Sequence, residues 1–164
     1  MNRNQLTNRV SVRAFLIGVC LASFLAATGA AAKDKPLKKS DLPAAVQKTA
    51  DEQSTGATVR GYASEVEDGK LQYEVQLTVN GHSKDLSIAP DGKLLEIEEQ
   101  VALDSLPAPV REGLQKKAGA GKITKVESLT KHGTLVAYEA QVLTGKKKSE
   151  VQVGPDGKPL AHPE

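Results

Sequence analysis

The chain has 164 residues, with 22 Lys and Arg against 20 Asp and Glu, which gives a formal net charge of +2. A charge so close to zero argues against a nucleic-acid-binding protein, because such a protein carries a strongly basic patch. The single cysteine excludes an internal disulfide framework and a cysteine-rich metal site. Aromatic residues make up 3% of the chain, so few large side chains exist for a core or an interface.

The first 32 residues have the layout of a secretory signal peptide. Three arginines and no acid precede an uncharged run from Ala14 to Ala32, which ends in small residues just before Lys33. This layout predicts export and cleavage after Ala32, to a periplasmic or secreted location with no stable membrane anchor. The alternative is a retained anchor, because the uncharged run of 19 residues is close to the ~20 that span a bilayer. The Ala, Thr and Gly content near the end of the run favours cleavage.

The predicted mature chain differs in composition from the full sequence. Residues 33–164 carry 19 basic and 20 acidic side chains, and they lack Cys, Met, Phe and Trp. Their only aromatic residues are Tyr62, Tyr73 and Tyr138. Residues 33–40 contain four lysines and one aspartate, and we expect them to form a flexible, Lys-rich lead-in.

Three short motifs occur twice, in the same order and 64 or 65 residues apart. The pairs are Leu42–Val46 with Leu106–Val110, Tyr73–Leu77 with Tyr138–Val142, and Leu86–Lys93 with Val151–Lys158. A constant offset over three matches predicts an internal duplication, with one repeat over residues 41–103 and the second over 104–164.

Each repeat is predicted to open with a helix. The first spans Leu42–Gln53 after a cap at Ser40 or Asp41, and the second begins at Asp104 or Ser105 and ends at Gly119–Gly121. Both have apolar residues at i, i+4 and i+8, which form one stripe along a helix. These residues are Leu42, Val46 and Ala50 in the first repeat, and Leu106, Val110 and Leu114 in the second.

The remainder of each repeat is predicted to be an antiparallel meander. Gly-containing turns such as Asn80-Gly81 and Asp91-Gly92 separate runs in which apolar and polar residues alternate. In residues 70–79 the odd-numbered side chains are apolar, and Leu95 and Ile97 are expected to face the core in a fourth strand. The predicted class is α+β, with two tandem repeats that each pack one helix on a four-stranded sheet and leave the other sheet face polar and open.

This order of motifs resembles the PepSY-like, or beta-lactamase-inhibitor-like (BLIP-like), tandem-repeat exported bacterial proteins. The resemblance is carried by the Leu-Pro-Ala-x-Val helix starts, the Tyr-Glu-x-Gln strands and the Pro-Asp-Gly-Lys turns, and it covers about residues 40–162. It implies two α/β units side by side with a curved polar surface, in modules that bind and inhibit secreted enzymes or restrain peptidases. It brings no catalytic motif, and the chain lacks the aromatic-rich, disulfide-containing interface of the inhibitor that gives the fold its name.

The open sheet face is the candidate partner-binding surface. We expect a non-enzymatic exported module that binds a protein or peptide of the cell envelope, and the resemblance extends this to restraint of a peptidase or another envelope enzyme. The candidate residues are Arg60, Tyr62, Glu74, Gln76, Glu96, Glu139, Gln141 and Glu150.

The alternative is a cation- or small-ligand-binding envelope protein that uses the acidic first repeat. Residues 41–103 carry 12 acids and 5 bases, whereas residues 104–164 carry 7 acids and 10 bases. The acids do not form an EF-hand loop, because Ser64 and Val66 stand where that loop needs acidic residues.

No catalytic residue, metal site or cofactor is predicted. His82, His132 and His162 lack ligand spacing such as HExxH and are expected to be solvated, as are the lysines of Lys146–Lys148.

Overall fold

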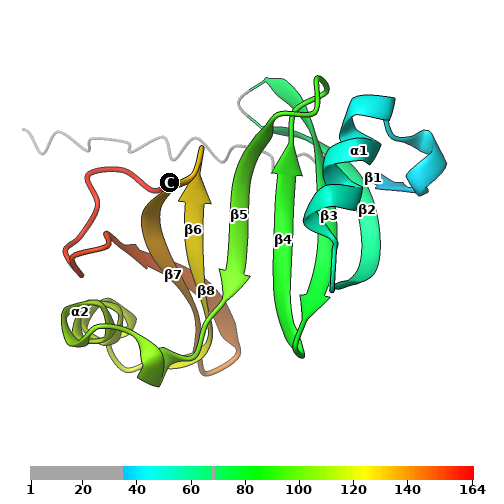
Figure 1. Ribbon diagram of the computed structural model, residues 1–164. Coiled ribbons are helices and arrows are strands. Elements are labelled where there is room, and N and C mark those ends of the chain that lie inside the picture. Colours follow the sequence, from blue (N-terminus) through cyan, green and yellow to red (C-terminus); the bar gives the residue numbers. More distant parts are fainter. Residues whose placement is uncertain (1–34, 68) are drawn as a thin grey trace, which may run out of the picture. The chain divides into compact units, whose positions relative to one another are not determined.

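The computed structural model describes residues 35–67 and 69–164, so the predicted signal peptide and its cleavage site lie outside the described residues. The elements in chain order are β1 Lys35–Leu37, η1 Lys39–Asp41, α1 Ala44–Gln53, β2 Thr58–Glu67, β3 Lys70–Val79, β4 His82–Ile88, β5 Leu94–Gln100, η2 Leu103–Ser105, α2 Ala108–Ala118, β6 Lys122–Lys131, β7 Thr134–Thr144 and β8 Lys147–Val153 (Figure 1). Within this part of the chain, no helix is long and apolar enough to cross a membrane.

All eight strands form one antiparallel sheet in the order β1 to β8. The α+β class is confirmed, but the prediction of a four-stranded sheet in each repeat is wrong. Strand β5 pairs with β6, from Glu96 opposite Lys131 to Gln100 opposite Glu127, and joins the two halves. The second half has only three strands, because residues 154–164 form no strand. Three prolines in that segment lack the N–H group that a strand ladder needs.

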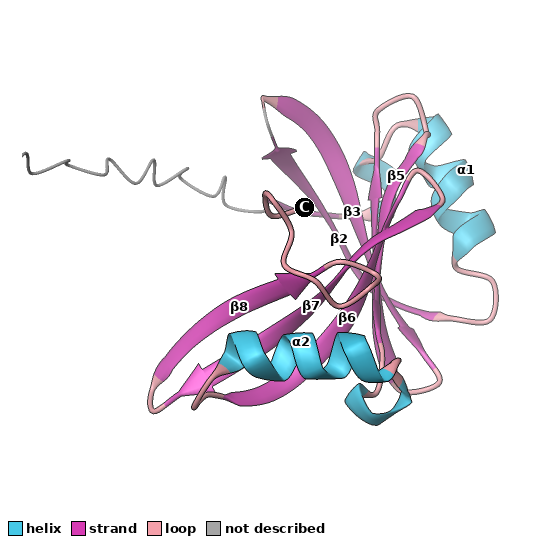
Figure 2. Cartoon of the chain, turned by 90° about the vertical axis from the view of Figure 1, so that its left-hand side faces the viewer, coloured by secondary structure: helices cyan, strands magenta, loops and turns pink. Residues whose placement is uncertain are grey.

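Both helices pack on the same face of the sheet. One buried cluster joins the stripe of α1 to Val75, Leu77, Leu86 and Ile88, and the other joins the stripe of α2 to Val126, Ala140 and Val153. Strand register places the side chains of both clusters on one face, which we call the helix face (Figure 2). The opposite face is the open face. The two predicted helix stripes and the inward positions of Tyr73 and Tyr138 are confirmed.

The helices begin later than predicted. Leu42 and Leu106 are extended, with ψ of 146° and 152°, because the proline that follows each of them disfavours helical backbone. The carboxylate of Asp41 therefore does not cap α1. It accepts a hydrogen bond of 2.9 Å from the backbone N–H of Lys38 and closes the preceding 3₁₀ turn. The predicted caps at Ser40, Asp41, Asp104 and Ser105 are wrong for the two α-helices, which have no side-chain cap.

The predicted lead-in is ordered where the structure describes it. Strand β1 pairs with β2, with Lys35 opposite Ser64 and Leu37 opposite Tyr62, and Leu37 packs against the first core cluster. The expectation of a flexible segment is therefore wrong for residues 35–37, because burial of Leu37 fixes the chain against the sheet.

A bulge changes the face to which β5 directs its first residues. Between Ser87 and Ile88 the register shifts, so that Leu94, rather than Leu95, stands opposite Ile88. Leu94 and Ile97 pack against the first core cluster. The predicted inward position is therefore confirmed for Ile97 and wrong for Leu95.

The two Pro-Asp-Gly-Lys turns are built alike and hold the helices against the sheet. In each, the aspartate Oδ1 accepts a 3.0 Å hydrogen bond from the backbone N–H of the lysine. Gly92 and Gly157 have positive φ, of 88° and 79°. A Cβ atom at Gly92 would lie 2.8 Å from the carbonyl oxygen of Ala45, and one at Gly157 would overlap that of Pro109. Only glycine allows this approach of the turn to the helix backbone.

We expect Gly157→Ala to lower the free energy of unfolding by about 2–5 kcal/mol, from left-handed backbone strain and overpacking together. Gly145→Ala is the matched control, because Gly145 has a φ of 63° but nothing near its Cβ position. It should cost only about 1–2 kcal/mol. Urea denaturation measures both, and equal losses in the two variants would show that the close helix approach contributes nothing.

Candidate binding face

The structure brings the sequence-predicted candidate residues onto the open face, with one exception. Register places Glu74, Gln76, Glu96, Glu139, Gln141 and Glu150 there, and Arg60 reaches the same face at a bulge in β2. Tyr62 stands opposite Val75 and packs against the first core cluster. Its predicted place on the open face is wrong, because the bulge between Val59 and Gly61 shifts the alternation of β2.

Glutamine amides hold several carboxylates of this face in place. The buried Gln72 donates to Glu65 Oε1 at 2.8 Å and to Glu67 Oε2 at 2.7 Å. Gln76 donates to Glu74 at 3.0 Å. In the second half, Gln152 Nε2 donates to Glu139 Oε2 at 2.8 Å. These hydrogen bonds fix the positions of the carboxylates on the sheet.

Carboxylates stand directly opposite one another at the centre of the face. Asp85 on β4 pairs across strands with Glu98 on β5, and Glu127 on β6 pairs with Glu139 on β7. Like charges placed opposite each other destabilise a sheet. Acidic side chains also outnumber basic ones over the whole open face. The acids are Glu65, Glu67, Glu74, Asp85, Glu96, Glu98, Glu127, Glu139 and Glu150, and the bases are Arg60, Lys70, Lys122, Lys125, Lys131 and Lys148.

Three ion pairs offset part of this charge. Arg60 donates from Nη2 to Asp85 Oδ1 at 2.8 Å. Lys125 Nζ lies 2.5 Å from Glu127 Oε1, and Lys131 Nζ lies 3.8 Å from Glu96 Oε2. Within the described residues, Glu98 has no such cationic partner.

Burial and mutual repulsion raise the pKa of the central carboxyl groups. The pKa of Glu98 rises to about 8, mainly because its carboxylate is desolvated and then because Glu127, Glu96, Glu139 and Asp85 surround it. The other cross-strand neighbour of Glu98 is the buried Leu129, whose side chain is apolar and offers the carboxylate no hydrogen bond.

The same desolvation raises the pKa of three further carboxyl groups. It raises the pKa of Asp85 against the effect of Arg60, and that of Glu96 against the effect of Lys131. It also raises the pKa of Glu139, although the hydrogen bond from Gln152 acts in the opposite direction. The centre of the face therefore holds protons more tightly than exposed carboxylates do.

Sequence reasoning missed four residues of this centre, Asp85, Glu98, Glu127 and Gln152. Alternation along β4 and β5 already directs Asp85 and Glu98 outward. The pairing of β5 with β6 could not be inferred, and that pairing brings Glu127 beside them.

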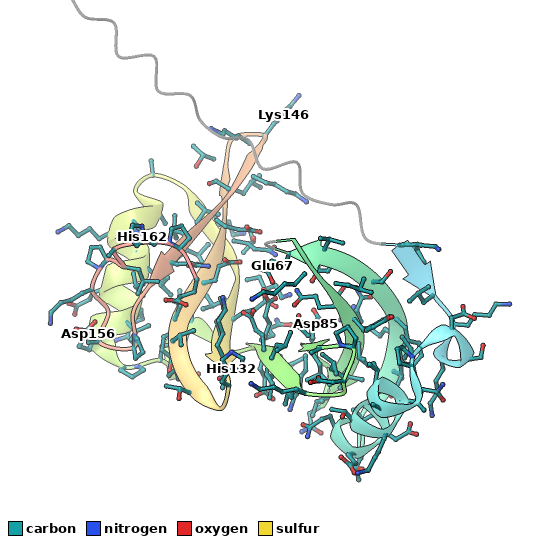
Figure 3. All side chains as sticks on the ribbon, turned by 90° about the horizontal axis from the view of Figure 1, so that it is seen from above. Glu67, Asp85, His132, Lys146, Asp156 and His162 are labelled. Atoms are coloured by element: carbon teal, nitrogen blue, oxygen red, sulfur yellow. The ribbon has the colours of Figure 1, made fainter. Side chains whose placement is uncertain are left out.

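The other predicted solvated residues lie at exposed positions. His82, His132 and His162 are exposed, and Lys146 lies at the tip of the β7–β8 hairpin, away from Asp85 on the sheet (Figure 3). Among the described residues, one group of potential ligands is close enough to share a cation, namely Asp85, Glu98 and Glu127.

No protein-family model matches the sequence, and no curated protein matches it. Solved structures do match. A proposed periplasmic protein from Bacteroides eggerthii superposes with a TM-score of 0.59 at 20% identity, over 71% of this chain and 84% of that one. A DUF2874 family protein from Bacteroides ovatus gives a TM-score of 0.58 at 20% identity, over 73% and 84%.

A BLIP-like protein from Bacteroides fragilis superposes with a TM-score of 0.54 at 18% identity, over 73% of this chain and 83% of that one. The chain therefore has the fold of these proteins, and the predicted resemblance to BLIP-like proteins is confirmed for the fold. At this level of identity the likeness describes the fold alone.

The raised pKa of Glu98 predicts that stability falls as pH rises. Between pH 4.5 and about 8 the folded state keeps a proton on Glu98 that the unfolded state has released, so folding becomes less favourable across this window and levels off above it. Glu98→Gln should remove the loss and make the protein about 1–3 kcal/mol more stable at pH 9 than its parent, since one pKa unit is worth about 1.4 kcal/mol and solvent screens part of the effect.

Urea denaturation in chelator-containing buffer from pH 5 to pH 9 measures this dependence. Glu112→Gln, at an exposed position of α2, is the control and should leave the pH profile unchanged. A parent profile that does not fall with pH, or an unaltered fall in Glu98→Gln, would contradict the prediction.

Proposed function

We propose that the protein is an exported, non-enzymatic binding module that holds a protein or peptide partner against its open face. The signal-peptide layout of residues 1–32 supports a periplasmic or secreted location. The description of one structural neighbour as a proposed periplasmic protein agrees with that location. The module needs no cofactor for this role.

The observation that carries the proposal is the opposition of carboxylates across β4–β5 and β6–β7. A sheet that needed only stability would not place Asp85 opposite Glu98 and Glu127 opposite Glu139. Each pair costs stability, either through charge repulsion or, as at Glu98, through the uptake of a proton that relieves it. A lysine- or arginine-rich segment of a partner would offset this repulsion. The same charge would repel the phosphates of nucleic acid.

The open face suits an electrostatic interaction better than a tight, aromatic-anchored one. Tyr62, Tyr73 and Tyr138 all pack on the helix face, so the described residues give the open face no aromatic side chain to act as a binding hot spot. Charge complementarity raises association rates and selectivity more than it raises affinity. We infer a reversible partner, in line with a PepSY-like module that restrains an envelope enzyme, and we propose that its two halves arose by duplication.

Charge reversal tests which face binds. Glu74→Lys with Glu139→Lys should reduce capture of partners from a periplasmic extract by at least about tenfold, because two repulsive sites replace attractive ones. Glu52→Lys with Glu112→Lys is the matched control, since it makes the same charge change at exposed positions of α1 and α2.

Carbodiimide cross-linking, which joins neighbouring carboxylates and lysines, then maps the contact. Cross-links to Glu74, Glu139 or Glu150 are the expected result. Equal capture by the open-face variant and the control variant, or cross-links confined to the helices, would contradict the assignment of the open face.

A further inference from the structure

We propose that residues 158–164 form a displaceable strap that limits access to the part of the open face built by β6, β7 and β8. This segment, which we call the strap, follows the Pro-Asp-Gly-Lys turn of the second half. In Figure 1 it runs away from α2 and reaches the end of β6. Its meaning as a regulator rests on the proposed function, because the strap lies on the face to which the partner is assigned.

The beginning of the strap is fixed next to α2. The backbone oxygen of Lys158 accepts a 2.8 Å hydrogen bond from the N–H of Gly154, and the N–H of Lys158 donates to Asp156 Oδ1 at 3.0 Å. The close approach of Gly157 to Pro109 holds the same turn against the helix. The strap therefore starts from a set position on the helix side of β8.

The other end of the strap lies on the open face. The backbone N–H of Glu164 donates to Gln152 Oε1 at 2.8 Å, and the backbone oxygen of Glu164 lies 3.5 Å from Gln152 Nε2. The Glu164 carboxylate also lies 4.0 Å from Lys131 Nζ, which pairs with Glu96 as well. Since Gln152 and Lys131 both belong to the open face, the strap passes around the edge strand β8 from one face of the sheet to the other.

One amide group connects the strap to the carboxylates of the face. Gln152 Nε2 donates to Glu139 Oε2 at 2.8 Å, and this bond orients the amide so that Oε1 accepts the N–H of Glu164. A cationic group of a partner that paired with Glu139 would compete for the bond that orients Gln152. The strap would then lose its anchor, so partner binding and strap release are coupled through a single side chain.

The strap is held loosely enough to be displaced. Leu160 is half-buried, whereas the other residues of the strap are exposed. A cleft of about 520 Å³ separates Leu160 and Pro163 from Glu139 and Glu150 on the sheet. One hydrogen bond between such groups shifts an equilibrium by roughly 2- to 12-fold. The strap therefore lowers the affinity for a partner by about that factor and does not block the face permanently.

Two prolines keep the strap out of the sheet. In the first half the chain continues from its Pro-Asp-Gly-Lys turn into β5, whereas in the second half it continues into the strap. Pro159 and Pro163 lack the N–H group that a strand ladder needs, and their fixed φ leaves the strap fewer conformations to lose when it docks. The segment in the place of a fourth strand therefore docks on the face without joining the sheet.

Carbodiimide labelling with glycinamide tests the strap without any partner, so this result is independent of the proposed function. A variant that ends at Lys158 keeps the turn and removes the rest of the strap. Labelling of Glu139 should rise in this variant by about 2- to 12-fold, which is the protection that one hydrogen bond provides. Glu52 on α1 is the internal control and should be labelled equally in both proteins. Equal labelling of Glu139 in the two proteins would overturn the proposal, provided that circular dichroism shows both to be folded.

NMR relaxation of the Glu164 backbone amide gives a second readout. In the parent this amide should be as ordered as the amides of β8, and Gln152→Leu should make it as mobile as a free chain end. Gln141→Leu, at another open-face position, is the matched control and should leave the amide ordered. An amide of Glu164 that is already mobile in the parent contradicts the strap.

An oligolysine peptide at low ionic strength then tests the strap as a regulator. The variant that ends at Lys158 should bind it about 2- to 12-fold more tightly than the parent. Loss of the acidic Glu164 would by itself weaken the binding of a cationic peptide, so tighter binding reports removal of the strap. Equal or weaker binding in the variant overturns the proposal. If neither protein binds oligolysine but Glu139 labelling rises, the strap is supported and the lysine-rich partner of the proposed function is rejected.

Discussion

The pairing of β5 with β6 is the contact on which the arrangement of this protein depends. Each half has its own helix and its own buried cluster, but the carboxylates of the two halves meet only because Glu96–Gln100 and Glu127–Lys131 lie side by side. The backbone ladder holds these acids together at a spacing that their charges oppose. Hydrogen bonding between strands and burial on the helix face must therefore offset the repulsion on the open face.

Local features could be predicted from the sequence because they depend on periodicity and turn chemistry. The stripes Leu42-Val46-Ala50 and Leu106-Val110-Leu114 and the inward tyrosines of β3 and β7 needed no knowledge of the partner strand. Features that depend on register could not be predicted. Bulges moved Tyr62 and Leu95 away from their expected faces, and a contact between distant segments placed Glu127 beside Glu98. The prolines after β8 are visible in the sequence and explain why the second half has three strands instead of the predicted four.

On the open face the positions of the carboxylates are fixed, whereas the protonation state of one of them varies with pH. Gln72, Gln76 and Gln152 fix the carboxylates that surround its centre, whereas the protonation of Glu98 changes near neutral pH. The glutamines therefore determine where the carboxylates lie, and Glu98 determines how the net charge of the face changes with pH. A change in pH would alter the charge offered to a partner without requiring a rearrangement of the strands.

The two end strands determine how the sheet ends. At one end β1 consists of three residues and includes Pro36, which has no N–H to offer a further strand. At the other, β8 begins with Lys147 and Lys148, and Lys117 from α2 donates to the carbonyl oxygen of Gln152 at 2.9 Å. Short length, proline and lysine all discourage the addition of another strand. Edge-to-edge growth of the sheet from one copy of the chain to the next is thereby disfavoured.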